Sequence, residues 1–178
     1  MNSPLVMTLL ALTGLGVAVV VPVLIRLYQA SRIEEITPEW LENFSPDSYA
    51  PMEQLLSRED FNFLKRQPGF HAAAIRRFRR ERLRIFRQYL NRIILDFSRL
   101  QLAARIVIAH SAVDQSPLLR RLMSLRIRFA VAVIRVEFSY LLCCLGCGTV
   151  AVQSLIASLK EMSEQLNVLT AANAFSVS

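Results

Sequence analysis

Three cysteines, Cys143, Cys144 and Cys147, form the densest group of side chains that could bind a metal or carry out redox chemistry. Cys144 and Cys147 have the C-x-x-C spacing of half a zinc site or of a redox pair. A zinc site usually needs four ligands, and the two histidines, His71 and His110, are remote in the sequence. An antiparallel hairpin could bring His71 back toward the cysteines, but small buried cysteines near a helix end are the simpler interpretation.

The other polar residues form no recognisable catalytic motif. His71 and His110 have no serine or cysteine in a catalytic context beside them. Asp96 lies inside an apolar run, where we expect it to pair with Arg92 or Arg99 at helical spacing. The chain has no phosphate-binding glycine loop, no metalloprotease helix motif and no nucleotide-binding fingerprint. We therefore expect a protein that is not an enzyme and needs neither a metal nor another cofactor.

The most distinctive polar feature is an arginine-rich segment with seven arginines in twelve residues. A helix turns 100° per residue, so these side chains cannot share one face, and some must cover an apolar stripe with their aliphatic stems. Three interpretations are open: a solvated face paired with acids of the same chain, a contact for anionic lipid headgroups or an acidic partner, and a nucleic-acid contact. Nucleic acid is the least favoured, because no DNA- or RNA-binding motif is present. The candidate site for lipid or an acidic partner comprises Arg76, Arg77, Arg79, Arg80, Arg82, Arg84 and Arg87.

Charge is segregated along the chain, whose formal net charge is +7. Residues 33–60 contain eight acids and one base, whereas residues 61–137 contain 17 bases and four acids. Prolines and large apolar side chains interrupt the acidic region, which predicts a linker with short helices that packs on the main domain. One hypothesis is that acids such as Glu34, Glu35 and Glu39 cover the arginine-rich segment until a partner displaces them.

The N-terminal region contains a long uncharged run. Residues 5–25 carry no charge, and 21 residues are about the length needed to cross a hydrocarbon core of roughly 30 Å. The flanking residues do not resemble a cleavage site, so the run predicts an uncleaved signal anchor. Of 21 Lys and Arg residues, 20 lie between Arg26 and Arg135, and the positive-inside rule then puts the N-terminus outside and the rest in the cytoplasm. We expect a single-pass protein of the inner (plasma) membrane.

A second uncharged run, residues 138–159, is the alternative candidate for a transmembrane helix. Gly146 and Gly148, followed by Thr149, indicate a helix stop and a new N-cap inside the run. The residues after Thr149 are amphipathic, with one apolar and one polar side. We therefore favour a single transmembrane helix over two.

The central and C-terminal parts of the chain have the pattern of long helices. Apolar residues recur at helical spacing from Leu83 to Val107, which predicts one helix of about 40 residues. Ser116 and Pro117 provide an N-cap and a first-turn proline for a second helix, and the short connection makes the two helices antiparallel. A last amphipathic helix over residues 150–169 would complete a bundle or coiled coil.

The predicted fold class is therefore all-α, with one N-terminal transmembrane helix followed by a long antiparallel helical hairpin or bundle. The predicted segments are an external N-terminus at 1–4, a transmembrane anchor at 5–25, an acidic linker at 26–69, a cytoplasmic hairpin or bundle at 70–169 and a frayed tail at 170–178.

These features favour a membrane-anchored, non-enzymatic interaction or scaffold protein whose basic face binds anionic lipid or an acidic protein. The alternative is a structural or assembly subunit of a membrane complex, as a homo-oligomer or with other chains. A second group of arginines is more simply a solvated surface than a binding site. It comprises Arg120, Arg121, Arg126, Arg128 and Arg135.

Overall fold

The computed structural model describes residues 3–30, 37–57, 59, 63, 66, 71–109, 116–144 and 150–177. These residues form helices and contain no strand, so the all-α prediction is confirmed. The elements are α1 (Ser3–Ala30), α2 (Pro38–Glu42), the 3-10 helix η1 (Pro46–Tyr49), α3 (Pro51–Gln54), α5 (Ala72–Ala109), α6 (Ser116–Cys144) and α7 (Gln153–Val177).

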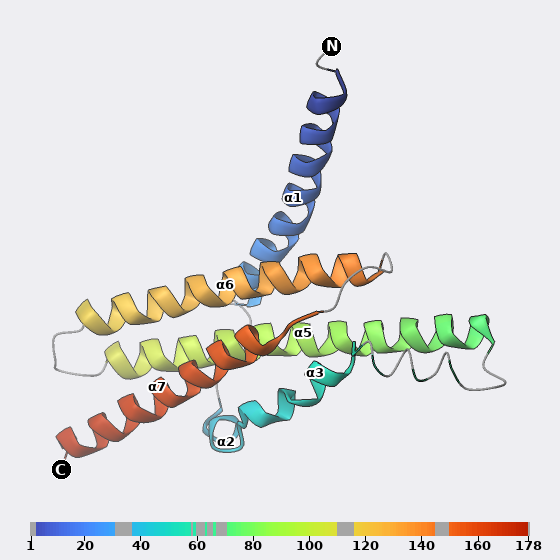
Figure 1. Cartoon of the computed structure of the whole chain (residues 1–178). Helices are drawn as coiled ribbons and strands as arrows, with labels where there is room; N and C mark the ends of the chain where they lie inside the picture. The colour runs from blue at the N-terminus through green and yellow to red at the C-terminus, as the bar shows by residue number, and fades with distance from the viewer. Residues whose placement is uncertain are drawn as a thin grey trace.

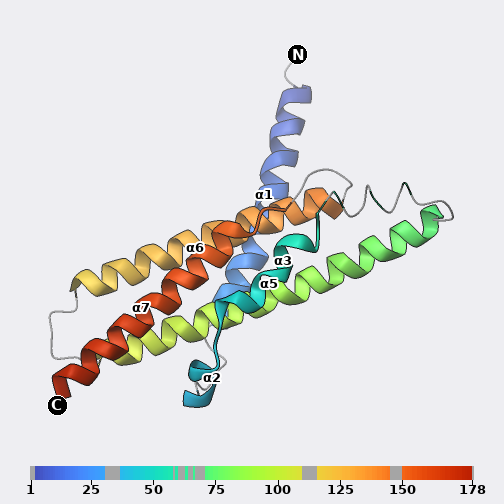
Figure 2. The ribbon, with the colours of Figure 1, turned by 60° about the horizontal axis from the view of Figure 1, so that its bottom comes forward.

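The three long helices α5, α6 and α7 form an elongated bundle (Figures 1 and 2). As predicted, α5 and α6 run antiparallel, and α6 begins at Ser116 with a proline in its first turn. α7 packs extensively against both α5 and α6, which touch each other much less. The expected hairpin is therefore held together mainly by the third helix. α7 continues to Val177, so most of the C-terminal stretch that we expected to be frayed is helical.

The core of the bundle is built from the apolar stripes of these helices. Phe97 of α5 and Phe129 of α6 stack with their ring centroids 3.7 Å apart, and both residues are buried. α7 contributes Leu155, Leu159 and Met162, all fully buried. Burying one such side chain stabilises the fold by about 1.5–3 kcal/mol, so these contacts account for the association of the three helices.

The acidic linker packs on the bundle, as predicted. Pro38, Pro46 and Pro51 each stand at the start of one short helix, where the missing amide hydrogen costs no intrahelical bond. Tyr49 of η1 and Met52 of α3 are buried in the core shared with α5, α6 and α7. Burial of apolar side chains therefore fastens the linker to the bundle.

The prediction of an N-terminal transmembrane anchor is wrong. In the described part of the chain, no helix combines the length and the apolar character that crossing a membrane requires. The C-terminal end of the uncharged run packs on protein: Val23 is buried in the core, and Arg26 donates a hydrogen bond to Glu137 of α6. The signal anchor, the integral membrane association, the orientation with the N-terminus outside and the inner-membrane location were inferred from that anchor and are corrected with it.

The alternative of a transmembrane helix over residues 138–159 is wrong as well. α6 ends at Cys144 and α7 begins at Gln153, so the uncharged run is divided between two helices of the bundle. The helix stop predicted between them is consistent with this division, although Gly146, Gly148 and Thr149 lie outside the described residues.

Candidate interaction surfaces and buried polar contacts

The arginine-rich segment lies in the N-terminal half of α5, whose first turns extend beyond the ends of α6 and α7 (Figures 1 and 2). Its seven arginines fall into two sets. Arg76, Arg77, Arg80 and Arg84 are exposed, whereas the other three are partly buried. Arg77, Arg80 and Arg84 follow the i, i+3, i+7 spacing that aligns side chains along one side of a helix. These four exposed side chains define the basic stripe of α5.

The partly buried arginines are engaged within the molecule. Arg79 donates to the backbone carbonyl of Cys143, in the last turn of α6, where a positive charge complements the helix dipole. Arg82 lies over the ring of Phe78, with 4.5 Å between the guanidinium carbon and the ring centroid, and donates to the Leu55 carbonyl. These arginines join α5 to α6 and to the linker. The prediction that some arginines of the segment flank the apolar stripe is therefore confirmed.

Arg87 takes part in a buried polar contact around Glu137. The Glu137 carboxylate is one of two buried acidic groups among the described residues, and Arg26 of α1 approaches one of its oxygens to 2.8 Å. Arg87 lies 3.9 Å from the other oxygen and also covers the ring of Tyr140. One carboxylate on α6 therefore connects the end of α1 with α5, and two arginines offset the cost of burying its charge.

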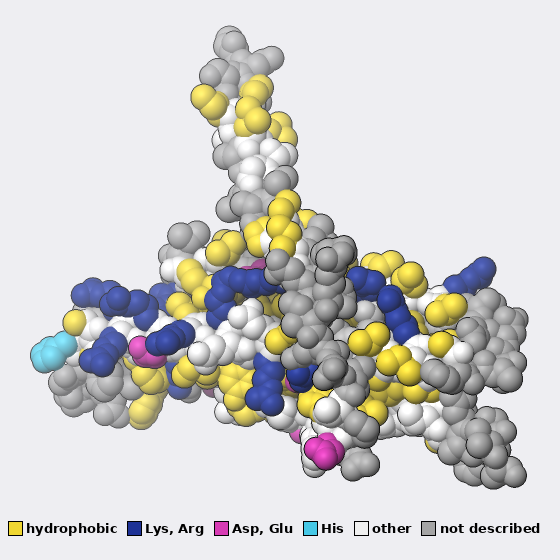
Figure 3. All heavy atoms as spheres, turned by 180° about the vertical axis from the view of Figure 1, so that it is seen from behind, with side chains coloured by type: hydrophobic (Ala, Val, Ile, Leu, Met, Phe, Trp, Pro, Cys, Tyr) yellow, Lys and Arg dark blue, Asp and Glu magenta, His cyan; other side chains and the backbone are white. Residues whose placement is uncertain are grey.

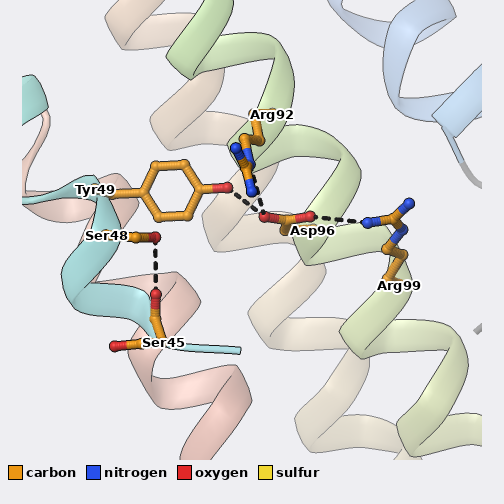
Figure 4. Close-up of polar contacts among 6 residues, drawn as sticks. All are labelled: Ser45, Ser48, Tyr49, Arg92, Asp96 and Arg99. Atoms are coloured by element: carbon orange, nitrogen blue, oxygen red, sulfur yellow. Dashed lines mark hydrogen bonds and ion pairs between the residues drawn. The ribbon is translucent and has the colours of Figure 1, made fainter. Parts of the chain in front are cut away.

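The second buried acid, Asp96 of α5, forms a similar contact with the linker (Figure 4). The Tyr49 hydroxyl of η1 donates to one carboxylate oxygen. Arg99 lies 3.4 Å from the other oxygen. The Nε atom of Arg92 lies 3.9 Å from the oxygen that accepts from Tyr49. The prediction that Asp96 pairs with Arg92 or Arg99 is confirmed for both. Burial, and to a smaller extent the hydrogen bond to Asp96, raises the pKa of Tyr49 well above its ordinary range. The phenol of Tyr49 therefore stays protonated.

The outward side of α6 carries a long row of apolar side chains. Its members recur at helical spacing over the whole helix, on the side opposite the buried residues Leu122, Leu125 and Phe129. An apolar row on the outer side of a packed helix indicates a surface that is covered by something else. The α6 outer row comprises Leu119, Met123, Ile127, Val131, Phe138, Leu141 and Leu142.

The apolar surface is close to positive charge. Viewed from behind, Lys and Arg side chains lie along the bundle on both sides of the projecting α1 and are interspersed with hydrophobic ones (Figure 3). Part of α1 itself is apolar and open: Met7, Leu9 and Leu10 are each more than 60% exposed. Apolar side chains mixed with arginine are typical of protein interfaces, which are enriched in aromatic residues, methionine and arginine.

The acidic linker does not pair with the basic stripe where the structure describes both. Glu39, Asp47, Glu53 and Glu59 form no ion pair with an arginine of α5 in the described residues. Glu34 and Glu35 lie outside those residues. The linker is instead held by its apolar side chains and by the Tyr49 hydroxyl. For the described acids, the structure therefore gives no support to the hypothesis that they cover the arginines.

The second group of arginines is spread over the surface of α6. Arg128 forms an ion pair with Glu161 of α7, with 3.1 Å between the nitrogen and the oxygen. Arg120, Arg121 and Arg135 are exposed. Exposed pairs of this kind contribute only about 0.2–1 kcal/mol, so their stabilising effect is small.

The cysteines and histidines are not assembled into a metal site in the described residues. Cys143 is buried and Cys144 is exposed at the end of α6, while Cys147 and His110 lie outside the described residues. His71 is exposed just before α5. No group of three or more His, Cys, Asp or Glu side chains in the described ranges could hold a metal ion.

No protein-family model, no curated protein and no solved structure matches the chain. No set of functional residues can therefore be transferred to it from a relative.

Glu137 and Tyr49 are two key polar residues that were not identified from the sequence. Glu137 is an isolated acid within a run of apolar residues, which is the same pattern that identified Asp96, and it could have been found in this way. Tyr49 gave no such indication, because its partner is 47 residues away in the sequence.

Proposed function

We propose that the protein is a non-enzymatic helical interaction protein whose basic stripe on α5 binds an acidic surface of a partner protein. The observation that carries the proposal is the division of the seven arginines: three are used inside the molecule, while Arg76, Arg77, Arg80 and Arg84 remain exposed. Arginine side chains donate charge-assisted, bidentate hydrogen bonds to carboxylates, which suits them to an acidic partner.

The arrangement of the stripe favours a helical partner over a planar surface. Arg77, Arg80 and Arg84 are aligned along α5, so carboxylates repeated at the same spacing on a second helix would meet them in register. Arg76 lies about 100° from Arg77 around the helix axis, so it is on a neighbouring side of α5 and outside this line of three.

The α6 outer row supports a second candidate function, as a subunit of a larger protein assembly. Seven apolar side chains on one outer face of α6 are more than a surface helix usually exposes, and a partner that covered them would gain the free energy of their burial. If the protein is an assembly subunit, the α6 outer row should mediate self-association, or tight binding of a partner that does not weaken as salt is added. The basic stripe, in contrast, predicts binding that weakens as salt is added.

Binding of the full chain to a helical peptide with glutamates at the i, i+3 and i+7 positions tests the proposal. We expect saturable binding that weakens at raised salt and is lost in the variant Arg77→Glu/Arg80→Glu/Arg84→Glu, because three attractive contacts become repulsive. Arg120→Glu/Arg121→Glu/Arg135→Glu reverses the same number of exposed arginines on α6 and serves as the matched control.

Two further samples in the same experiment decide between classes of partner. Vesicles rich in phosphatidylserine, compared with neutral vesicles, test a lipid surface, and duplex DNA tests nucleic acid. Binding to either of these, with no binding to the acidic helix, would overturn the proposal of a protein partner. Binding to the helix that survives the triple charge reversal would overturn the assignment of the stripe.

A further inference from the structure

A cavity lies between the linker and the bundle, away from the basic stripe. It has a volume of about 420 Å³, is partly open to solvent, and is lined by Ser48 and Tyr49 of η1 and by Gln88, Tyr89 and Arg92 of α5. Small-molecule sites commonly have volumes of about 300–1,000 Å³. This cavity is therefore large enough for a ligand with one ring and a charged group.

The charge of the cavity lining is positive. Arg92 is the one arginine or lysine in its lining, its side chain is 75% exposed, and its Nε atom lies 3.9 Å from the Asp96 carboxylate. An exposed guanidinium carries five N–H groups, so Arg92 can donate to a ligand as well as to Asp96. Asp96 itself is buried and already has the Tyr49 hydroxyl and Arg99 as partners (Figure 4). The carboxylate therefore orients Arg92 and does not present a negative charge to a ligand.

The remaining lining groups are neutral donors and aromatic rings. The exposed Gln88 amide lies one helical turn before Arg92, at the i, i+4 spacing that puts both side chains on one side of α5. The Tyr49 and Tyr89 rings meet edge to face, with centroids 6.3 Å apart, and form an apolar corner next to these donors. A donor pair beside an aromatic corner suits a ligand with a planar ring and an oxyanion.

We propose that this cavity binds a small aromatic oxyanion, with its phosphate or carboxylate group on Arg92 and Gln88 and its ring against Tyr89. The site is independent of the basic stripe and adds a ligand-binding function to the proposed interaction function. Since the lining comes from both η1 and α5, a bound ligand would also fasten the linker to the bundle and raise the stability of the folded chain.

Titration calorimetry of the full chain with phenyl phosphate and benzoate tests the site, with neutral benzyl alcohol as the comparison. We expect saturable binding of at least one of the two anions and none of the alcohol. Arg92→Gln should weaken anion binding by about 10-fold or more, because a charge-assisted hydrogen bond is lost. Arg105→Gln, at an exposed arginine of the same helix outside both the cavity and the basic stripe, should leave it unchanged.

A second variant keeps the test decisive if Arg92→Gln disturbs the buried Asp96. Gln88→Glu introduces a negative charge at an exposed position of the lining and should weaken anion binding by about 10-fold without altering the core. Absence of binding to both anions, or binding that neither variant weakens, would overturn the proposal. Binding of benzyl alcohol equal to that of the anions would overturn the assignment of the charge-recognising residues.

Discussion

The guanidinium of Arg26 lies 2.8 Å from a carboxylate oxygen of Glu137, so a cation at the end of α1 neutralises an acid buried in α6. The two residues are 111 positions apart in the sequence. Arg87 is the second cation near Glu137, at 3.9 Å. This contact and the Tyr49 contact with Asp96 attach α1 and the linker residues 37–57 to the bundle through specific polar partners.

Replacing Arg26 alone should destabilise the protein more than replacing Arg26 and Glu137 together. Arg26→Met leaves the buried Glu137 with only the more distant Arg87, and we expect a loss of about 1–3 kcal/mol in the free energy of unfolding. The double variant Arg26→Met/Glu137→Met removes the charge together with its partner and should recover much of that loss. Urea unfolding of the wild type, the two single variants and the double variant measures both quantities. A double variant less stable than either single variant would contradict this account of the contact.

Removing the Tyr49 hydroxyl should weaken attachment of the linker. In Tyr49→Phe, Asp96 keeps its arginines but loses a buried donor, which we expect to cost about 1–3 kcal/mol in the free energy of unfolding near neutral pH. Tyr89→Phe, on the neighbouring and only partly buried ring, is the control and should have a smaller effect. Urea unfolding of both variants gives the comparison, and equal losses would show that the hydroxyl of Tyr49 has no special role.

The same tyrosine predicts a loss of stability at alkaline pH. Burial and the hydrogen bond to Asp96 raise the pKa of Tyr49 above its ordinary value of 10.0. The folded state therefore favours the protonated phenol, and this contribution is complete below the pKa of the unfolded chain and is lost as the pH rises toward the folded pKa. Above about pH 10, the free energy of unfolding should fall more steeply in the wild type than in Tyr49→Phe, by up to about 1.4 kcal/mol per pH unit. Parallel pH profiles for the two proteins would refute this assignment.

The stacked rings of Phe97 and Phe129 should be essential for the bundle. Phe97→Ala removes a fully buried ring in contact with α6, and losses of about 3–5 kcal/mol are typical of such substitutions. Phe97→Leu retains most of the apolar volume and should cost less. Phe63→Ala is the control, because that side chain is 63% exposed and its replacement should change stability by no more than about 0.5 kcal/mol. Thermal unfolding of the three variants tests the expected order.

Sequence periodicity predicted much of the bundle, because apolar residues at helical spacing identify a buried stripe whatever they pack against. The stripes of α5 and α7 were found in this way, whereas the linker was predicted only to contain short helices, and the structure shows that each begins at a proline. The last helix was expected to complete the bundle, but periodicity does not reveal that α7 packs more extensively against α5 and α6 than these two helices pack against each other. Partners distant in the sequence, such as Arg26 and Glu137, are set by the three-dimensional arrangement.

The anchor was predicted wrongly for a related reason. An uncharged run indicates a need for an apolar environment but does not say what provides it. Val23 obtains that environment in the protein core, next to an arginine that has its own buried acid. The arginine-rich segment was in part predicted correctly: helix geometry required some arginines to turn inward, but only the structure shows that these are Arg79, Arg82 and Arg87.

Two neighbouring residues of α6 separate the role of its inner face from that of its outer row. Leu125 is fully buried, whereas Ile127 of the outer row is 64% exposed. Leu125→Glu puts an unpaired charge into the core and should prevent folding. Ile127→Glu should leave the free energy of unfolding within about 0.5 kcal/mol of the wild type, because the side chain already faces solvent.

The same pair of variants tests whether the outer row is an interface. If Ile127 is covered in an assembly, Ile127→Glu should reduce self-association or partner binding while the helix content stays unchanged, since a charge in the centre of an apolar interface is left unpaired on association. Sedimentation of the wild type and Ile127→Glu at increasing concentration provides the measurement, with circular dichroism as the check on folding. If the wild type and Ile127→Glu both sediment as monomers, the protein does not self-associate through this row. A different chain would then be the molecule that covers it.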